Sequence, residues 1–206
     1  ASALLRHLGI AEQTGLEFHI EKYIAPGSGL GSSAAAAVAS VVAVNALLGE
    51  PLRRYELIQF AMEGEKLASG NVHADNVAPC LFGGFRLIRG YEPLDVVEIQ
   101  YPRTLHTTII YPQVEVKTSE ARNMLPDHIP LKDAITQWGN VGGLIAGLQN
   151  KNYPLISRSL VDRVAEPHRA KLIPLYAEVK LMAEKHDCLG CNISGSGPAI
   201  FILSED

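Results

Sequence analysis

The sequence lacks clusters of basic residues, long uninterrupted apolar runs and enough cysteine for a disulfide framework, and each lack excludes a class of protein. A formal net charge of −4 gives no electrostatic reason to expect nucleic acid or an anionic membrane as a partner. The longest apolar run begins at Ala34 but contains Ser40 and Asn45, so it does not predict a membrane span. Three cysteines do not make a disulfide scaffold, and a reducing cytoplasm is the simplest location.

What remains is the composition of an ordinary globular protein. Hydrophobic residues make up 47% and charged residues 19% of the 206 positions, which supplies enough apolar side chains for a folded core. Strand-like segments alternate with helical ones, and neighbouring strands look like hairpins, so we predict an α+β fold. The proline-marked region from Pro93 to Pro102 is the best domain boundary and divides the chain into residues 1–101 and 102–206.

The expected elements follow hydrophobic periodicity and the positions of glycine and proline. Residues from Leu16 to Ile24 alternate between apolar and polar, which predicts a half-buried strand, and a polar turn is expected from Asn71 to Asn76. The other expected strands are 81–88, 96–100, 104–111 and 199–203. The expected helices are 2–8, 33–48, 52–69, 119–124, 131–149 and 174–186.

A loop rich in glycine and serine, between the first strand and a long helix, is the strongest local signal. Glycines let the backbone approach an anion closely, and the free N–H groups and dipole at a helix start favour negative charge. Serine hydroxyls can cap the helix, donate to phosphate or bind a metal. The candidate phosphate-binding residues are Pro26, Gly27, Ser28, Gly29, Leu30, Gly31, Ser32 and Ser33.

Three other interpretations of this loop compete. A Walker P-loop requires Gly-Lys-Ser/Thr at the helix start, and this loop has no lysine. A dinucleotide site is superficially matched by Gly29, Gly31 and Ala34, but Gly49-Glu50-Pro51 leads into a second helix rather than into a strand that ends in an acidic residue. A glycine turn before a serine-capped helix with an alanine face is the purely structural alternative.

The loop, Pro-x-x-Gly-Leu-Gly-Ser-Ser-Ala-Ala, resembles the ATP-binding motif of the GHMP kinases, the superfamily of galactokinase and of homoserine, mevalonate and phosphomevalonate kinases. The family proline commonly lies four residues before the Gly of Gly-Leu-Gly-Ser-Ser, whereas Pro26 lies three before Gly29. A second segment resembles the glycine-rich loop that packs beside the nucleotide in these enzymes. Its candidate cofactor-binding residues are Ser194, Gly195, Ser196 and Gly197.

The resemblance implies ATP and Mg²⁺ as ligands and a two-domain GHMP kinase-like fold, with antiparallel or mixed sheets and helices on one face. Residues 1–101 would be the remainder of the N-terminal ATP-binding domain, and residues 102–206 a truncated C-terminal domain. In the family, a substantial segment with its own glycine-containing motif precedes the strand that starts at Leu16, and another helix and strand follow the last strand. We therefore expect these 206 residues to be an internal fragment with little activity alone, and to self-associate or be marginally stable.

One branch of the superfamily fits best. The segment Gly70-Asn-Val-His73-Ala-Asp75-Asn76-Val-Ala-Pro resembles the homoserine kinases closely and the other branches poorly, and Thr118 to Arg122 and Asp162 to Arg169 resemble further segments of that branch. The resemblance implies ATP-dependent phosphorylation of the L-homoserine hydroxyl to O-phospho-L-homoserine, on the route to threonine. It allows a homodimer. Another GHMP kinase with a different small alcohol, and a non-catalytic GHMP-like ligand-binding regulator, are the alternatives.

The substrate suggests roles for these residues. Homoserine carries a carboxylate, which Arg122 and Arg169 could bind through paired N–H groups, and an ammonium, which Asp75 could accept. Each has a structural alternative: a solvated helix arginine in the first two cases, and a cap of the turn before Val77 in the third. The remaining substrate candidates are His73, Asn76 and Thr118, of which Thr118 either binds the carboxylate or caps the following helix.

The expected catalytic residues are Ser33, Glu65 and Asn76, and the first two are, by resemblance, the Mg²⁺ ligands. Glu63 would point elsewhere, because residues two apart do not share a helical face, and a solvated carboxylate is the structural alternative for Glu65. Several GHMP kinases have an Asp where this branch has Asn, and a neutral amide cannot be a general base. In-line phosphoryl transfer depends mainly on positioning and charge stabilisation, so the proton could leave to phosphate or water.

A Cys-x-x-Cys pair near the C-terminus is weaker evidence for a site. Cys188 and Cys191 lie close to His186, but a zinc site needs four ligands and the sequence has no second spaced pair. We expect them to be buried small side chains ahead of the last strand.

Overall fold

The computed structural model describes residues 1–69 and 73–205, and these form two compact units. The first unit contains residues 1–26 and 31–98, and the second contains residues 27–30 and the chain from Ile99 onward. The division predicted from the prolines did not anticipate that loop residues 27–30 cluster with the second unit. Gly70, Asn71 and Val72, with which the expected substrate motif begins, lie outside the described residues.

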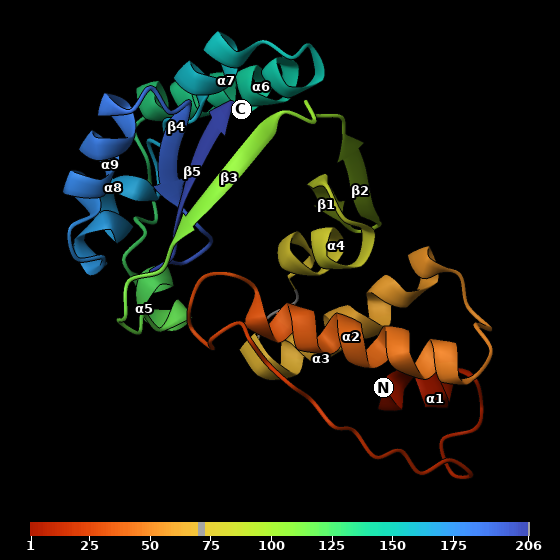
Figure 1. The fold of residues 1–206 in the computed structure, drawn as a ribbon. Coiled ribbons are helices and arrows are strands. Elements are labelled where there is room, and N and C mark those ends of the chain that lie inside the picture. Colours follow the sequence, from red (N-terminus) through yellow and green to blue (C-terminus); the bar gives the residue numbers. More distant parts are fainter. Residues whose placement is uncertain (70–72, 206) are drawn as a thin grey trace. The chain divides into compact units, whose positions relative to one another are not determined.

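The first unit is largely helical (Figure 1). Its core holds apolar side chains from four helices, among them Leu4, Val41, Ala61 and Val77, which are at most 1% exposed. Its elements are α1 (Ser2–His7), α2 (Ser32–Leu47), the 3-10 helix η1 (Arg54–Leu57), α3 (Ile58–Ser69), α4 (Ala74–Phe82) and the paired strands β1 (Phe85–Tyr91) and β2 (Leu94–Ile99).

The second unit is built on an antiparallel sheet of order β3-β5-β4, against which α8 and α9 lie beside β4 (Figure 1). Thr108 pairs with Ile202, and Asn192 pairs with Phe201. Tyr176, Cys191 and other buried residues form the core between α9 and the sheet. The elements are β3 (Leu105–Ile110), α5 (Thr118–Asn123), α6 (Leu131–Gln149), α7 (Tyr153–Ser159), α8 (Glu166–Arg169), the 3-10 helix η2 (Ala170–Leu172), α9 (Tyr176–Lys185), β4 (Gly190–Ile193) and β5 (Ile200–Glu205).

The structure confirms the α+β class and most of the predicted elements. Helix α6 has the predicted bounds, and α1, α2, α5, α9, β2, β3 and β5 differ from them by at most two residues at either end. The helix expected over residues 52–69 is divided into η1 and α3. No helix of the described residues is long and apolar enough to cross a membrane.

The strand predicted from Leu16 to Ile24 is wrong. The segment has no strand assignment, and Phe18, Ile20 and Tyr23 are 43%, 55% and 91% exposed. Alternation shows which side chains share a face, but a strand also needs a neighbouring backbone to accept and donate hydrogen bonds, and none is paired with this segment among the described residues.

Asn71 and Val72 of the polar turn predicted over residues 71–76 lie outside the described residues, and the turn is wrong for residues 74–76, which are helical. The strand predicted over residues 81–88 is confirmed only from Phe85 to Ile88. Helix α4 begins at Ala74 and buries Ala74, Val77, Ala78 and Leu81, a helical spacing that the polar residues between them obscure. Gly83 and its neighbour Gly84, both with positive φ, end the helix, so the strand begins only at Phe85. Helices α7 and α8 and strand β4 were not predicted.

Candidate functional site

The loop of candidate phosphate-binding residues 26–33, called the phosphate loop below, contains three glycines whose backbone lies in the left-handed region of φ/ψ space. Gly27, Gly29 and Gly31 have φ values of +69°, +80° and +71°. Gly31 is the N-cap of α2, and its carbonyl oxygen accepts the first helical hydrogen bond, from the Ala35 N–H at 2.9 Å. A β-branched or bulky residue would be strained at these positions, which is the local reason for the glycines. The chain thereby presents the N–H groups of the first turn of α2, as a phosphate site requires.

The three serines of the loop have different roles. The Ser28 side chain is buried, and its oxygen accepts a hydrogen bond from the Leu30 N–H at 3.3 Å. The Ser32 hydroxyl donates to the Ile24 carbonyl oxygen at 2.8 Å rather than capping the helix. Ser33 is half-buried and lines a cavity. Of the three hydroxyls, that of Ser33 is therefore the best placed to meet a ligand.

The second glycine-rich loop packs directly on the first within the second unit. The Ser194 hydroxyl donates to the Gly29 carbonyl oxygen at 2.9 Å, and the Ala199 N–H donates to the Ser28 carbonyl oxygen at 3.0 Å. A Cβ atom on Gly29 would overlap the Ser194 carbonyl oxygen and lie 2.7 Å from that of Gly197. The two motifs that the sequence separates by more than 160 residues thus form one backbone assembly.

The expected substrate motif lies at the start of α4, in the first unit. Asn76 is exposed, and a Cβ added to Gly31 at the N-terminus of α2 would lie 3.3 Å from its Oδ1. His73 is the N-cap of α4 without a side-chain capping bond, and its Nδ1 lies 3.9 Å from Asp75 Oδ1. The amide of Asn76 is therefore close to the N-terminus of α2, and the carboxylate of Asp75 lies one residue before it on the same helix.

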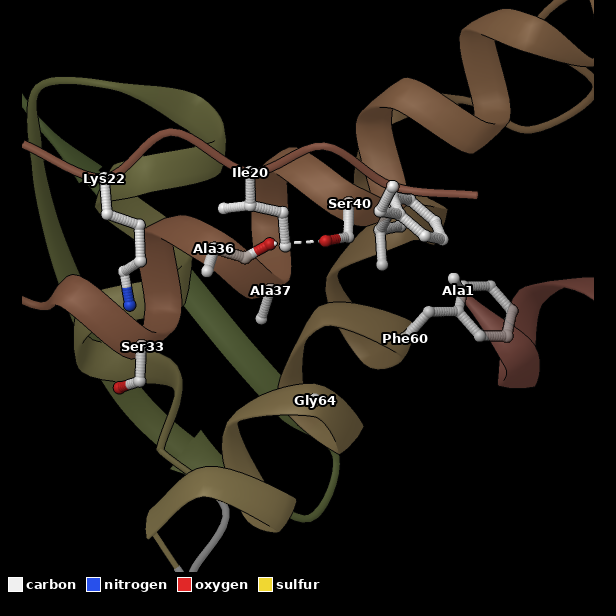
Figure 2. A pocket seen from close by; sticks show the side chains of 11 residues that line it. Ala1, Ile20, Lys22, Ser33, Ala36, Ala37, Ser40, Phe60 and Gly64 are labelled. Carbon is white, nitrogen blue, oxygen red and sulfur yellow. Dashed lines mark hydrogen bonds between the residues drawn. The ribbon is translucent and has the colours of Figure 1, made fainter. Parts of the chain in front are cut away.

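A cavity of about 380 Å³ lies along α2, beginning at Ser33 near the N-terminus of this helix (Figure 2). Lys22 and Ser33 lie at one end, and Ala1 and Phe60 lie at the other. Sequence reasoning missed Lys22, whose ammonium can attract an anion; a basic residue shortly before the glycine loop was the available signal.

Glu65 is suited to a metal that takes oxygen ligands. The residue is only 4% exposed on α3, where an ordinary surface glutamate would be solvated. Small side chains let α2 and α3 approach closely, since a Cβ on Gly64 would lie 3.0 Å from the Cβ of Ala37. Ser33 lies one turn before Ala37 on α2 and Glu65 follows Gly64 on α3, so the two expected Mg²⁺ ligands come from helices that pack on each other. No group of three His, Cys, Asp or Glu side chains within residues 1–69 and 73–205 could hold a metal by itself.

Three further predicted residues lie in the second unit. Thr118 is the first residue of α5 rather than its N-cap, and its hydroxyl lies 3.4 Å from that of Ser196. Arg169 donates from Nε to the Ala121 carbonyl oxygen at 3.2 Å and from a terminal nitrogen to that of Gly195 at 2.9 Å. Burial lowers the pKa of Arg169, Asp162 raises it, and the charge of Arg122 lowers it. Two guanidinium groups thus interact electrostatically beside the second glycine loop.

The three cysteines give no support for a metal or redox site. Cys80, Cys188 and Cys191 are free thiols. Cys191 is 4% exposed on β4, and its burial raises the pKa of the thiol to about 11. A thiol that stays protonated at neutral pH is a poor nucleophile and metal ligand.

Two family models match the chain. The model described as the GHMP kinases N terminal domain matches residues 1–84, and the model described as GHMP kinases C terminal matches residues 144–206.

Curated relatives are similar over nearly the whole chain. A homoserine kinase of Chlorobium phaeovibrioides is 52% identical over 190 residues, which cover 92% of this chain and 59% of the relative. A homoserine kinase of Methanococcus maripaludis is 43% identical over 94% of this chain and 64% of its own length. The chain spans about three fifths of the length of the curated relatives it matches.

Solved structures of GHMP kinases are also similar to this chain. The crystal structure of homoserine kinase from Cytophaga hutchinsonii has a TM-score of 0.91 at 51% identity and covers 99% of this chain and 64% of that one. Mevalonate kinase from L. major, at 17% identity and a TM-score of 0.74, shares the fold alone.

Proposed function

The chain belongs to the GHMP kinase family, and on this premise we propose that the protein is an ATP-dependent homoserine kinase that forms O-phospho-L-homoserine in threonine biosynthesis. The observation that carries the proposal is the closeness of Asn76, from the motif that resembles the homoserine branch, to Gly31 at the N-terminus of α2, where an added Cβ would lie 3.3 Å from the Asn76 Oδ1. This closeness supports a substrate site for the motif beside a phosphate site at the N-terminus of α2. Relatives named homoserine kinase, whose sequences are 51–52% identical to this chain, support the same substrate.

In this proposal the phosphates of ATP bind the N-terminus of α2. The left-handed glycines expose backbone N–H groups there, and the helix dipole favours the negative charge of the phosphates. Within the second unit, the Ser194 hydroxyl donates to the Gly29 carbonyl oxygen, so residues 27–30 of the loop are held before ATP arrives. Such preorganisation lets the N–H groups stabilise charge that develops during transfer without reorienting.

Ser33 and Glu65 would hold Mg²⁺. The bound ion would neutralise charge on the phosphates during transfer. The buried carboxylate of Glu65 and the close packing of α2 on α3 support this assignment.

The zwitterionic substrate would be held by complementary charges. Arg122 and Arg169 would bind its carboxylate, since a guanidinium matches a carboxylate with parallel N–H donors, and Thr118 would add a hydroxyl. Asp75 would accept the ammonium. His73 and Asn76 would orient the side-chain hydroxyl toward the γ-phosphate.

No side chain is assigned as the base. Asn76 stands next to the loop, but its amide has no site to take a proton. The hydroxyl proton would leave to the transferred phosphate or to water, while the protein contributes positioning and charge stabilisation. Free thiols at all three cysteines suit the cytoplasm as the site of this reaction.

The test is a transfer assay on the full-length protein with ATP and Mg²⁺. ADP release is followed with L-homoserine, mevalonate, phosphomevalonate and galactose, and we expect homoserine to give the highest kcat/KM. Transfer to mevalonate but not to homoserine would assign the protein to another GHMP branch. Saturable binding of homoserine or ATP, without conversion of ATP to ADP in the presence of any of these alcohols, would instead favour a non-catalytic regulator.

A further inference from the structure

Helix α8 has only four residues, too few to be stable by itself, and it is held at its start by a side chain. The carboxylate of Asp162 accepts hydrogen bonds from the N–H groups of Val164, Ala165 and Glu166, at 2.7, 2.9 and 3.1 Å. These bonds fix the first turn. At the other end of the helix lies Arg169.

A partly buried ion pair fixes the same turn from α9. Lys180 Nζ pairs with Glu166 Oε1, and the two side chains are 29% and 12% exposed. The ammonium also lies 6.0 Å from the centre of the Tyr176 ring. The other carboxylate oxygen of Glu166 is buried, with no hydrogen-bond partner among the described residues. Lys180 is therefore the cationic partner of a carboxylate that has little contact with water.

Arg169 links this short helix to two elements of the proposed site. It donates to the Ala121 carbonyl oxygen in α5, one residue before Arg122, and to the Gly195 carbonyl oxygen in the second glycine loop. These bonds engage two of its five N–H donors and fix the plane of the guanidinium. A guanidinium binds a carboxylate in two bonds only when its plane is correctly set.

We infer that the Glu166–Lys180 pair is a positioning device that sets the orientation of Arg169 toward the substrate carboxylate, with Asp162 holding the intervening turn. Glu166 and Lys180 touch no ligand in this scheme and act through Arg169. The inference rests on the proposed function, because it assigns Arg169 to the carboxylate of homoserine. A pair that only stabilises the fold would instead change activity through the folded fraction.

A double-mutant cycle on the full-length protein separates these roles. In the parent background, we expect Lys180→Met to raise the KM for homoserine by about tenfold, the effect of weakening one charge-assisted hydrogen bond. In an Arg169→Lys background, where the fork is already lost, the same change should raise it no further. The kcat at saturating homoserine should change much less than the KM. Lys185→Met, on the exposed side of the same helix, is the matched control and should leave the KM unchanged.

Conservative variants keep the test decisive if Lys180→Met does not fold. Lys180→Arg retains the charge and should restore a KM close to that of the parent, whereas Glu166→Gln retains the shape and should raise the KM as Lys180→Met does. Additive effects in the cycle, or an unchanged KM in a folded Glu166→Gln variant, would overturn the inference. A parent protein that does not phosphorylate homoserine fails one step earlier, and that result rejects the proposed function together with the role given to Arg169.

Discussion

Gly29→Ala should separate the two glycine-rich loops. Gly29 has a φ of +80°, and a Cβ there would overlap the Ser194 carbonyl oxygen and lie 2.7 Å and 2.9 Å from the carbonyl oxygen and carbon of Gly197. All three atoms belong to the backbone, so no rotamer change can relieve the contact. The second loop must move, and it carries the Ser194 hydroxyl away from the Gly29 carbonyl oxygen.

The structure supplies a control that divides this cost into two parts. Gly49 also has a φ of +80°, but a Cβ there would meet nothing within 4 Å. Gly49→Ala should therefore lose only the left-handed strain, about 1 to 2 kcal/mol of unfolding free energy. Gly29→Ala should lose about 1 to 3 kcal/mol more from overpacking.

Urea denaturation measures both losses, and steady-state kinetics with ATP measures the functional effect. Because a displacement of about 1 Å at a reacting centre can cost about a hundredfold, we expect Gly29→Ala to lower kcat/KM for ATP by about that factor. Gly49→Ala should keep the parent value. Equal stability and equal kinetics in the two variants would refute the packing of one loop on the other.

Three further predictions address the proposed ligands and the core. Arg122→Lys keeps the charge but loses the planar fork, so the KM for homoserine should rise by about tenfold to a hundredfold while the KM for ATP changes little. Glu65→Gln should lower kcat by about a hundredfold or more without unfolding the protein, because a neutral amide is a poor Mg²⁺ ligand. Burial raises the pKa of Cys191 from 9.0 to about 11, so the unfolded chain loses its proton first as pH rises. The unfolding free energy should therefore fall between about pH 9 and 11, and Cys191→Ala should reduce that fall by about 1 to 3 kcal/mol.

Each of these three predictions has a control variant or a result that would contradict it. Arg163→Lys, at an exposed position, should leave the KM for homoserine unchanged. A parent-like KM in Arg122→Lys would show that Arg122 is a solvated helix arginine without a role in binding homoserine. Glu63→Gln, on the exposed face of α3, should keep full turnover, and full turnover in Glu65→Gln at saturating Mg²⁺ would reject the metal assignment. An alkaline slope in Cys191→Ala equal to that of the parent would assign the fall to other groups.

Local sequence signals predicted the elements that local forces determine. Helix α6 lies between Pro130 and Asn150, and these helix-ending residues together with the apolar spacing predict its bounds. The glycine loop before α2 was likewise predicted, because positive φ and a free helix start are local properties.

The parts that depend on distant partners were not predictable in this way. The alternation from Leu16 to Ile24 specifies two faces but no neighbouring strand. The bond of Ser194 to Gly29 joins segments far apart in the sequence, and the roles of Glu166 and Lys180 emerge only when α8 meets α9. A partly buried ion pair has no local signature, since each residue taken alone resembles a solvated charge.

The most direct test of the central claim is to identify the product of the full-length protein. Phosphorus NMR of a reaction with ATP, Mg²⁺ and L-homoserine should show one new phosphate ester, coupled to the protons of the substrate's terminal methylene group and formed in equal amount to ADP. ADP accompanied only by inorganic phosphate, or no ADP at all while another small alcohol is phosphorylated under the same conditions, would contradict the assignment of homoserine as the substrate.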